Sequence, residues 1–120
     1  MTPRRRAPFL LKRQEKKVLG NLVNGELLAV RGRQKIGYVT YVLVPKGPNQ
    51  KSQARISYVN VNPAHQRTGI ASKMLETIEK KVDTVVVLDV KGPILKLLAK
   101  RGYKIQRDPE EGFWAIKEKR

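Results

Sequence analysis

The stretch Val61-Asn-Pro-Ala-His-Gln-Arg-Thr-Gly-Ile-Ala-Ser-Lys-Met-Leu75 joins a β-branched run to an amphipathic helical pattern. Its loop contains Gln66, Gly69 and Ala71. The first turn of a helix has backbone N–H groups without intrahelical partners, and the helix dipole adds positive potential there. Gly69 lets the backbone turn without Cβ hindrance, and Ala71 leaves room beside the first turn. The junction therefore predicts a site for a phosphate or pyrophosphate.

The residues after this loop predict a βαβ unit. An apolar stripe recurs every four residues, at Ile70, Met74, Ile78 and Val82, which is typical of an amphipathic helix. Residues 84–90 are almost continuously β-branched, as in a strand covered on both faces and parallel to its predecessor. With a strand at 54–61 before the helix, the connection should be right-handed.

The N-terminal half predicts an antiparallel meander. Residues 17–23, 26–31 and 36–44 are β-rich, and Asn24-Gly25 and Gly32-Arg33 between them are hairpin-type signals. Residues 9–16 could instead form a short helix. A polar loop over residues 45–53 then leads to the strand at 54–61.

The C-terminal part predicts a second helix and a hairpin. Pro93 suits the first turn of a helix, and Gly102 suits its end. The residues expected to face inward are Ile94, Leu95, Leu97 and Leu98. Strands at 103–107 and 113–117 should pair as a hairpin, with Trp114 in the core.

The motif Gln66-x-x-Gly69-x-Ala71, preceded by Val61-Asn62-Pro63, resembles the acetyl-CoA-binding motif of the GNAT superfamily of N-acetyltransferases. The segment Ala99-Lys-Arg-Gly102-Tyr103 lies at the spacing expected of that family. The resemblance covers residues 26–117 and implies an α/β (α+β) fold: a mixed central sheet, with an N-terminal antiparallel meander, a βαβ unit, a second helix and C-terminal strands. The two helices that usually lie between the family's first and second strands have no room here.

The resemblance also implies how acetyl-CoA would be held. Backbone amides of residues 67–71 would bind the CoA pyrophosphate, and the pantetheine would lie along residues 58–61, with the amide of Val59 or Asn60 facing the thioester oxygen. The implied cofactor-binding residues are Val59, Asn60, Val61, Gln66, Arg67, Thr68, Gly69, Ile70, Ala71 and Lys73. The same positions also suit ordinary strand residues and a solvated helix start.

The acid and base of an acetyl transfer are less evident. Residues 54–61 contain no carboxylate, whereas many relatives have a Glu on this strand. Asp89, at the end of the second parallel strand, and Glu26 are the remaining candidates for the base. Asp89 could equally cap a helix or pair with a Lys. Leu98 stands where many relatives have a Tyr as general acid, and His65 is expected to be a loop-packing residue.

Composition excludes several classes of function. The chain has 120 residues and no cysteine, which rules out disulfides and thiolate metal sites, and its single histidine predicts no metal site at all. Its apolar runs are too short to span a membrane, and its N-terminus lacks a signal-peptide pattern. We expect a basic, disordered arm over residues 1–8, one domain over residues 9–120, and a cytoplasmic location.

Positive charge is the chain's most unusual property. The formal net charge is +16, from 26 Lys and Arg against 10 Asp and Glu, and this favours polyanionic partners such as nucleic acid or the ribosome. The alternative is that the charge serves solubility in general. The expected phosphate contacts are Arg4, Arg5, Arg6, Lys12, Arg13, Lys16 and Lys17.

Two functions follow from these features. The first is an acetyl-CoA-dependent N-acetyltransferase acting on a primary amine of a macromolecular or polyanion-associated substrate. The alternative is a catalytically weak or inactive GNAT-like module that binds nucleic acid or the ribosome. An exposed last strand could also support a homodimer.

Overall fold

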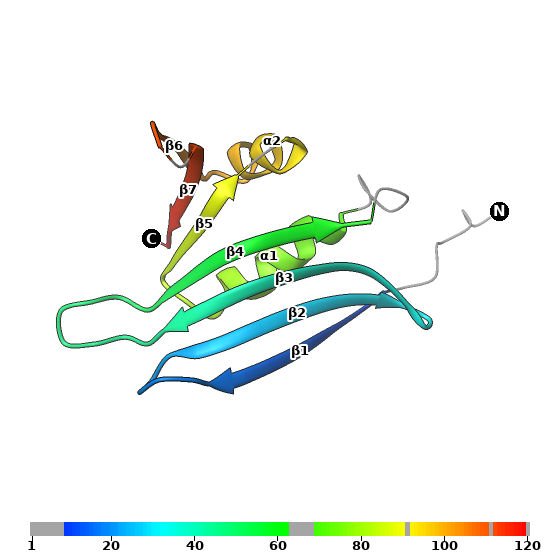
Figure 1. Cartoon of the computed structure of the whole chain (residues 1–120), viewed down its shortest axis with the longest axis horizontal. Coiled ribbons are helices and arrows are strands. Elements are labelled where there is room, and N and C mark those ends of the chain that lie inside the picture. Colours follow the sequence, from blue (N-terminus) through cyan, green and yellow to red (C-terminus); the bar gives the residue numbers. More distant parts are fainter. Residues whose placement is uncertain (1–8, 63–68, 91, 111, 120) are drawn as a thin grey trace.

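A computed structural model of the chain describes residues 9–62, 69–90, 92–110 and 112–119. Its centre is a seven-stranded sheet with the strand order β1-β2-β3-β4-β5-β7-β6 (Figure 1). The elements, in chain order, are β1 (Leu10–Lys17), β2 (Val23–Arg31), β3 (Gln34–Val44), β4 (Gln53–Val61), α1 (Ile70–Glu79), β5 (Thr84–Val90), α2 (Pro93–Lys100), β6 (Lys104–Asp108) and β7 (Gly112–Glu118).

The expected fold class is confirmed. Strands β1 to β4 form an antiparallel meander, β4 and β5 pair in parallel around α1, and β6 and β7 form an antiparallel hairpin. The boundaries of β5 and the start of α2 at Pro93 agree with the sequence pattern. The sheet is therefore mixed, with its single parallel pair in the βαβ unit.

The first hairpin differs from its prediction. Residues 10–17 form β1 rather than a helix, and the turn lies at residues 18–22, with Gly20 at φ 59°. Asn24-Gly25 lies inside β2 and forms no turn. Gly25 is required there for a different reason, because a Cβ would collide with the ring of Tyr41 on the neighbouring strand. The Asn-Gly signal was misread because packing across the sheet also selects glycine.

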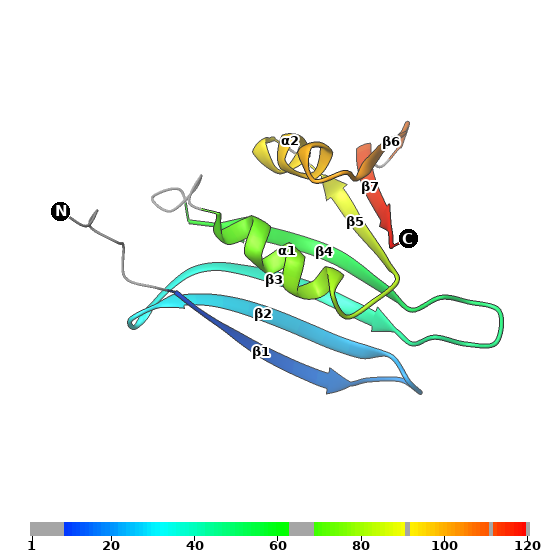
Figure 2. The ribbon, with the colours of Figure 1, turned by 180° about the vertical axis from the view of Figure 1, so that it is seen from behind.

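Helix α1 covers one face of the sheet, lying along β3 and β4 (Figure 2). Ile70, Met74, Leu75 and Ile78 are at most 1% exposed and pack into the main hydrophobic core. Burying each such side chain contributes about 1.5–3 kcal/mol. This face therefore provides most of the fold's apolar stabilisation.

The opposite face of the sheet has no helix over it among the described residues (Figure 1). The five residues 18–22 connect β1 to β2 directly, so the two helices usual at this point of the family's fold are indeed missing. Because side chains alternate along a strand, the residues between the core residues point to this helix-free face. The missing helices are the main structural difference between this chain and the usual fold of the family.

The C-terminal strands correct two expectations. The last strand, β7, lies between β5 and β6 and is not an edge strand. The expectation of a homodimer through an exposed last strand therefore loses its basis. Trp114 is only half-buried and lies outside the core, whereas its neighbour Ala115 is fully buried. In α2 only Leu98 is fully buried, while Ile94, Leu95 and Leu97 pack partly exposed against the core.

A polar cluster links the end of α1 to the C-terminal residues that follow α2 and to β7. The Glu79 carboxylate accepts hydrogen bonds from Arg101 Nη2 at 2.7 Å and from the Tyr103 hydroxyl at 2.8 Å, and Lys117 Nζ lies 3.4 Å away. Burial and the adjacent Glu79 both raise the pKa of Tyr103. The cluster joins α1, the residues after α2, and β7.

No helix in the described part of the chain is both long enough and apolar enough to cross a membrane.

Candidate functional site

Strands β4 and β5 pair only at their first residues and then diverge. Their ladder runs from Gln53 opposite Thr84 to Ile56 opposite Val87. The next residue of β4, Ser57, is an extra residue in the ladder with β3, where Tyr58 pairs with Thr40 and Ile56 with Tyr41. A β-bulge of this kind bends its strand and increases the local twist. It therefore accounts for β4 turning away from β5, as both views show (Figures 1 and 2).

The divergence opens into a groove of about 390 Å³ on the α1 side of the sheet. We call it the strand–helix groove, because the end of β4 and the starts of α1 and α2 form its walls. Its lining residues are Val59, Asn60, Val61, Gly69, Ile70, Ala71, Ser72, Pro93, Ile94 and Leu97. Gly69 is the N-cap of α1 with φ 84°, a conformation that side chains other than glycine rarely adopt.

The backbone of β4 has a defined polarity in the groove. The Asn62 N–H donates to the Ile36 carbonyl oxygen of the β3 side at 2.8 Å. Because successive peptide groups of a strand point to opposite edges, the amides of Val59 and Val61 are directed away from β3. They face the side where β5 no longer pairs with β4.

The groove contains several, but not all, of the residues expected to hold a cofactor. Val59, Asn60, Val61, Gly69, Ile70 and Ala71 all line it. Ile70 is 1% exposed, so its backbone rather than its side chain is available. Lys73 does not line the groove, and its ammonium lies 3.8 Å from Glu76 one turn along α1.

Part of the motif lies outside the described residues. This holds for Gln66, Arg67 and Thr68, and also for His65 and Pro63. The same is true of Arg4, Arg5 and Arg6 in the N-terminal arm. The structure thus describes the flanks of the Gln-x-x-Gly-x-Ala loop and its Gly69-x-Ala71 end.

Helix α2 presents apolar side chains to the groove. Ile94 and Leu97 line it, whereas Leu98 is 0% exposed and packs in the core. The family resemblance places Leu98 at the position of a general acid, but the helix directs the neighbouring Leu97 toward the groove. Neither residue can donate a proton.

Asp89 lies away from the strand–helix groove. It has φ 51° and sits with Leu88 in a bulge, because Val87 pairs with Ala115 and Val90 with Phe113, leaving only Trp114 opposite the two residues. Asp89 lines a separate hollow of about 620 Å³ together with Phe113 and Trp114.

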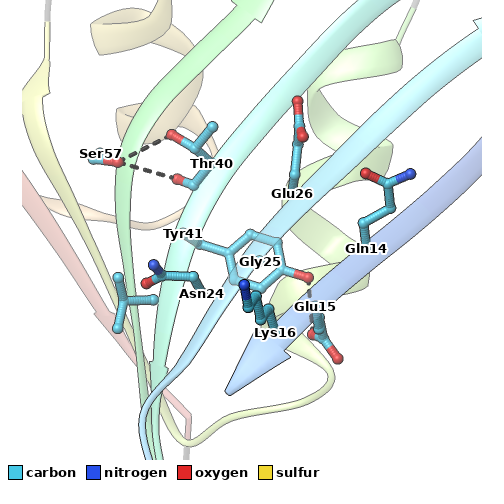
Figure 3. A pocket seen from close by; sticks show the side chains of 10 residues that line it. Gln14, Glu15, Lys16, Asn24, Gly25, Glu26, Thr40, Tyr41 and Ser57 are labelled. Atoms are coloured by element: carbon cyan, nitrogen blue, oxygen red, sulfur yellow. Dashed lines mark hydrogen bonds between the residues drawn. The ribbon is translucent and has the colours of Figure 1, made fainter. Parts of the chain in front are cut away.

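The helix-free face carries a second hollow, of about 460 Å³, across β1 to β4 (Figure 3). We call it the polar hollow. The side chains that line it from the helix-free face are Gln14, Lys16, Asn24, Glu26, Thr40, Val42 and Ser57. The hydroxyls of Thr40 and Ser57 lie 3.0 Å apart in hydrogen-bond contact. Glu26 was a candidate base, but the hollow itself was not predicted.

Two tyrosines lie next to the polar hollow on the same face. The rings of Tyr38 and Tyr58 stack with their centroids 5.2 Å apart. Partial desolvation, followed by the Tyr58 hydroxyl and by Glu26, raises the pKa of Tyr38. Sequence reasoning missed this pair because the bulge at Ser57 shifts the face on which Tyr58 lies.

Within the ranges that the structure describes, no three His, Cys, Asp or Glu side chains group closely enough to hold a metal ion.

The family follows from the sequence profile of the "Acetyltransferase (GNAT) family", which matches residues 4–103. This match spans most of the chain, and the protein therefore belongs to the GNAT acetyltransferase family. A search of curated proteins finds no significant match to the sequence.

Solved structures of acetyltransferases share the fold. The PaiA N-acetyltransferase of Thermoplasma acidophilum, in complex with coenzyme A, has 17% identity and a TM-score of 0.61, covering 78% of this chain and 59% of its own. Arabidopsis thaliana Naa50, bound to the bisubstrate analogue CoA-Ac-MVNAL, has 16% identity and a TM-score of 0.63, with 78% and 72% covered.

The YlbP N-acetyltransferase of Bacillus subtilis, in complex with coenzyme A, gives 13% identity and a TM-score of 0.64, with 80% of this chain and 68% of its own covered. At these identities the likeness concerns the fold. The chain spans about three fifths of the length of the Thermoplasma enzyme.

Proposed function

We propose that the protein is an acetyl-CoA-dependent N-acetyltransferase that acts on a primary amine. The observation that carries this proposal is the divergence of β4 from β5 into the strand–helix groove, which begins at Gly69 on the N-terminus of α1. Acetyl-CoA would supply an activated acetyl group as a thioester. Family membership and the CoA-bound relatives support the same cofactor.

The groove offers complementary parts for each portion of the cofactor. Backbone amides at the start of α1, with Gln66, Arg67 and Thr68 before it, would bind the pyrophosphate. The apolar wall formed by Val59, Ile94 and Leu97 suits the pantetheine. Lys73 would have to give up its ion pair with Glu76 to reach a CoA phosphate. Of the expected cofactor-binding residues, it therefore has the weakest structural support.

The Val59 amide is our candidate for stabilising the thioester oxygen. From the sequence, both Val59 and Asn60 fit that role. Because the Asn62 N–H points to β3 and N–H directions alternate along a strand, the Val59 N–H points toward the divergence and is the better candidate. A backbone donor aimed at developing negative charge lowers the barrier to acyl transfer. The Asn60 amide points toward β3 instead.

Proton removal would take place on the helix-free side of the divergence. Glu26 and Asp89 both lie on that side, in different hollows. As the amine nitrogen forms its bond to the acetyl carbon and the carbon–sulfur bond breaks, the amine proton would pass to one of these carboxylates or to water. The α2 residues that line the groove are Pro93, Ile94 and Leu97, and none of them is an acid. Water would therefore protonate the leaving thiolate.

A second candidate function rests on the charges of β1. Lys12 and Lys16 pair across the sheet with Leu28 and Asn24 on the helix-free face, while Arg13 and Lys17 point to the other face. A catalytically weak module that binds nucleic acid or the ribosome would use these cations and the N-terminal arm. Its binding should weaken steeply between about 50 and 200 mM salt; flat salt dependence would rule this candidate out.

Calorimetric titration with acetyl-CoA tests the preferred function. The wild type should bind, and Gly69→Glu should weaken binding at least about 100-fold by placing a carboxylate at the expected phosphate site. Gly32→Glu is the matched control, because Gly32 also has positive φ and open space around it but lies in the β2–β3 turn and does not line the groove. No binding by the wild type, or equal loss in both variants, would contradict the proposal.

A further inference from the structure

The polar hollow is built from two cross-strand rows of side chains on the helix-free face. In one row Gln14, Glu26 and Thr40 stand opposite one another on β1, β2 and β3, and Tyr58 continues the row on β4. The next row consists of Lys16, Asn24, Val42 and Arg55. At about 4.8 Å between strands, each row crosses roughly 14 Å of surface.

The first row ends where β4 leaves β5. Ser57, which lines the hollow, is the bulged residue at that point, and Tyr58 follows it. The strand–helix groove lies on the other face of the same divergence. Since a cofactor in the groove would occupy the α1 side, an acceptor can approach only from the helix-free side, over the polar hollow.

The charges in the hollow form a specific pattern. Glu26 is the carboxylate that the hollow presents on the helix-free face; Glu15 is directed to the opposite side, where it accepts a hydrogen bond from the Tyr41 hydroxyl at 2.9 Å (Figure 3). In the adjacent row Lys16 lines the hollow, whereas Arg55, at the other end of the row on β4, lies outside its lining and donates its Nε–H to Gln53 Oε1 at 2.8 Å. On the helix-free face one carboxylate thus stands beside one cation in the hollow and a second cation next to the hollow, which fits an ammonium with carboxylates on either side of it.

The tyrosine pair adds an apolar wall for an alkyl chain. Tyr38 is a diagonal neighbour of Glu26, and Tyr58, which is 49% exposed, stacks on it at the divergence. The methylene groups of a lysine can pack along aromatic faces while its ammonium remains near a carboxylate.

The net charge of the protein further limits the chemical classes of acceptor that fit the hollow. At +16 the molecule repels small polycations such as polyamines and attracts anionic molecules. Glu26 in the middle of the hollow repels a nucleic-acid phosphate, whereas the side-chain amides and hydroxyls of Gln14, Asn24 and Thr40 match the donors and acceptors of a peptide backbone.

Building on the acetyltransferase function, we propose that the polar hollow binds the acceptor as an extended peptide segment in which acidic residues flank the amine-bearing residue. Glu26 receives the ammonium, the tyrosine pair receives its alkyl chain, and Lys16 and Arg55 receive the flanking carboxylates.

Fluorescence anisotropy with labelled peptides tests this without requiring turnover. Three peptides share one central lysine and differ only in acidic, neutral or basic flanks. We expect the acidic-flanked peptide to bind at least about tenfold more tightly than the basic-flanked one at low salt. Lys16→Glu should remove most of that preference. Lys104→Glu, an equal charge change at an exposed position on β6, should leave it intact.

The role of Glu26 has its own readout. The wild type should prefer the lysine peptide over the same peptide with that lysine already acetylated, and Glu26→Gln should abolish this preference. Equal binding of all flanks, equal effects of Lys16→Glu and Lys104→Glu, or a preference that survives Glu26→Gln would overturn the proposal. A single-stranded oligonucleotide could instead displace the peptide and bind more tightly to the Glu26→Gln variant. That result would assign the hollow to nucleic acid and would also overturn the proposal.

This outcome is separable from that of the proposed function. Peptide binding that follows the predicted pattern without acetyl-CoA binding would refute only the acetyltransferase. Acetyl-CoA binding without flank-dependent peptide binding would refute only the assignment of the hollow.

Discussion

The face of the sheet under α1 and the face without a helix share the same strands, yet their side chains differ in kind. On β4, Ala54 and Ile56 are fully buried under α1, while Arg55 between them is exposed on the other side. The α1 face holds the core and opens into the strand–helix groove. The helix-free face carries hydroxyls, amides and charges beside the tyrosine pair and a few aliphatic side chains such as Leu28 and Val42. The main hydrophobic core therefore lies on one face, while the other face leaves polar and charged side chains accessible.

The largest expected effect contrasts these faces directly. Ile56→Ala, at 0% exposure on the α1 face, should lower the free energy of unfolding by about 3–4 kcal/mol by leaving a cavity. Val42→Ala, half-buried in the polar hollow, should cost less than about 1 kcal/mol. Urea denaturation followed by circular dichroism measures both. Similar costs would mean that the helix-free face is part of the stabilising core.

A smaller effect concerns the polar cluster on the α1 side. Glu79→Ala should cost about 3 kcal/mol, because it leaves the largely buried Arg101 and the buried Tyr103 hydroxyl without their carboxylate. Glu76→Ala, one turn earlier on the exposed side of α1, removes a Lys80 contact of 3.1 Å and should cost about 0.5 kcal/mol. If Glu79→Ala were no worse than its control, the cluster would not hold the C-terminal strands in place.

Gly25 belongs to the α1 face of β2, with the ring of Tyr41 from β3 against it (Figure 3). Gly25→Ala should destabilise by about 2 kcal/mol, because the added Cβ must displace that ring from Glu15. In a Tyr41→Ala background the same substitution should cost almost nothing. Gly47→Ala, whose Cβ would meet only Gln50 at 3.6 Å, is the thermal-unfolding control. Additive costs in the double variant would show that the ring is not what Gly25 accommodates.

The smallest effect is a pH dependence at the closed end of the β4–β5 pair. Asp83 Oδ2 accepts hydrogen bonds from the Ser52 hydroxyl at 3.0 Å and from the Ser52 N–H at 3.3 Å. These bonds lower the pKa of Asp83 below its usual 3.8. Their stabilisation is therefore present above that value and lost as the pH falls through the lower, folded-state pKa.

Ser52→Ala should accordingly destabilise more at about pH 6 than at about pH 2. Chemical unfolding of both proteins across this interval measures the difference. Thr77→Ala, which removes a hydroxyl bonded to the Lys73 carbonyl at 2.8 Å, is the control and should show no such pH dependence. A destabilisation by Ser52→Ala that stays constant with pH would show that Asp83 does not contribute through its charge.

The parts of the fold that could be predicted are those governed by local pattern. The four-residue stripe gave α1, the β-branched run gave β5, and Pro93 gave the start of α2, because each follows from side-chain periodicity or backbone restriction within a few residues. The glycine of the motif also indicated the groove, since the start of α1 needs a residue that tolerates φ 84°.

The incorrect predictions depend on residues distant in sequence. Asn24-Gly25 looks like a turn until Tyr41 is placed against it from β3. Trp114 looks like a core residue until β7 is inserted between β5 and β6 and directs it to the open side. The resemblance matched Leu98 to the position of a general acid, but Leu97 lines the groove, because the packing of α2 against the core sets which side chains face it.

By itself, the sequence determined the family, the order of most of the elements and the motif at the start of α1, because these are encoded in short-range spacing and glycine chemistry. The tertiary structure decided which amide of β4 faces the divergence and which acidic side chains lie on the helix-free face. It also decided that Glu26, Lys16 and Arg55 share one surface. Such placements arise from strand register and bulges, which a single extra residue can shift from one face of a sheet to the other.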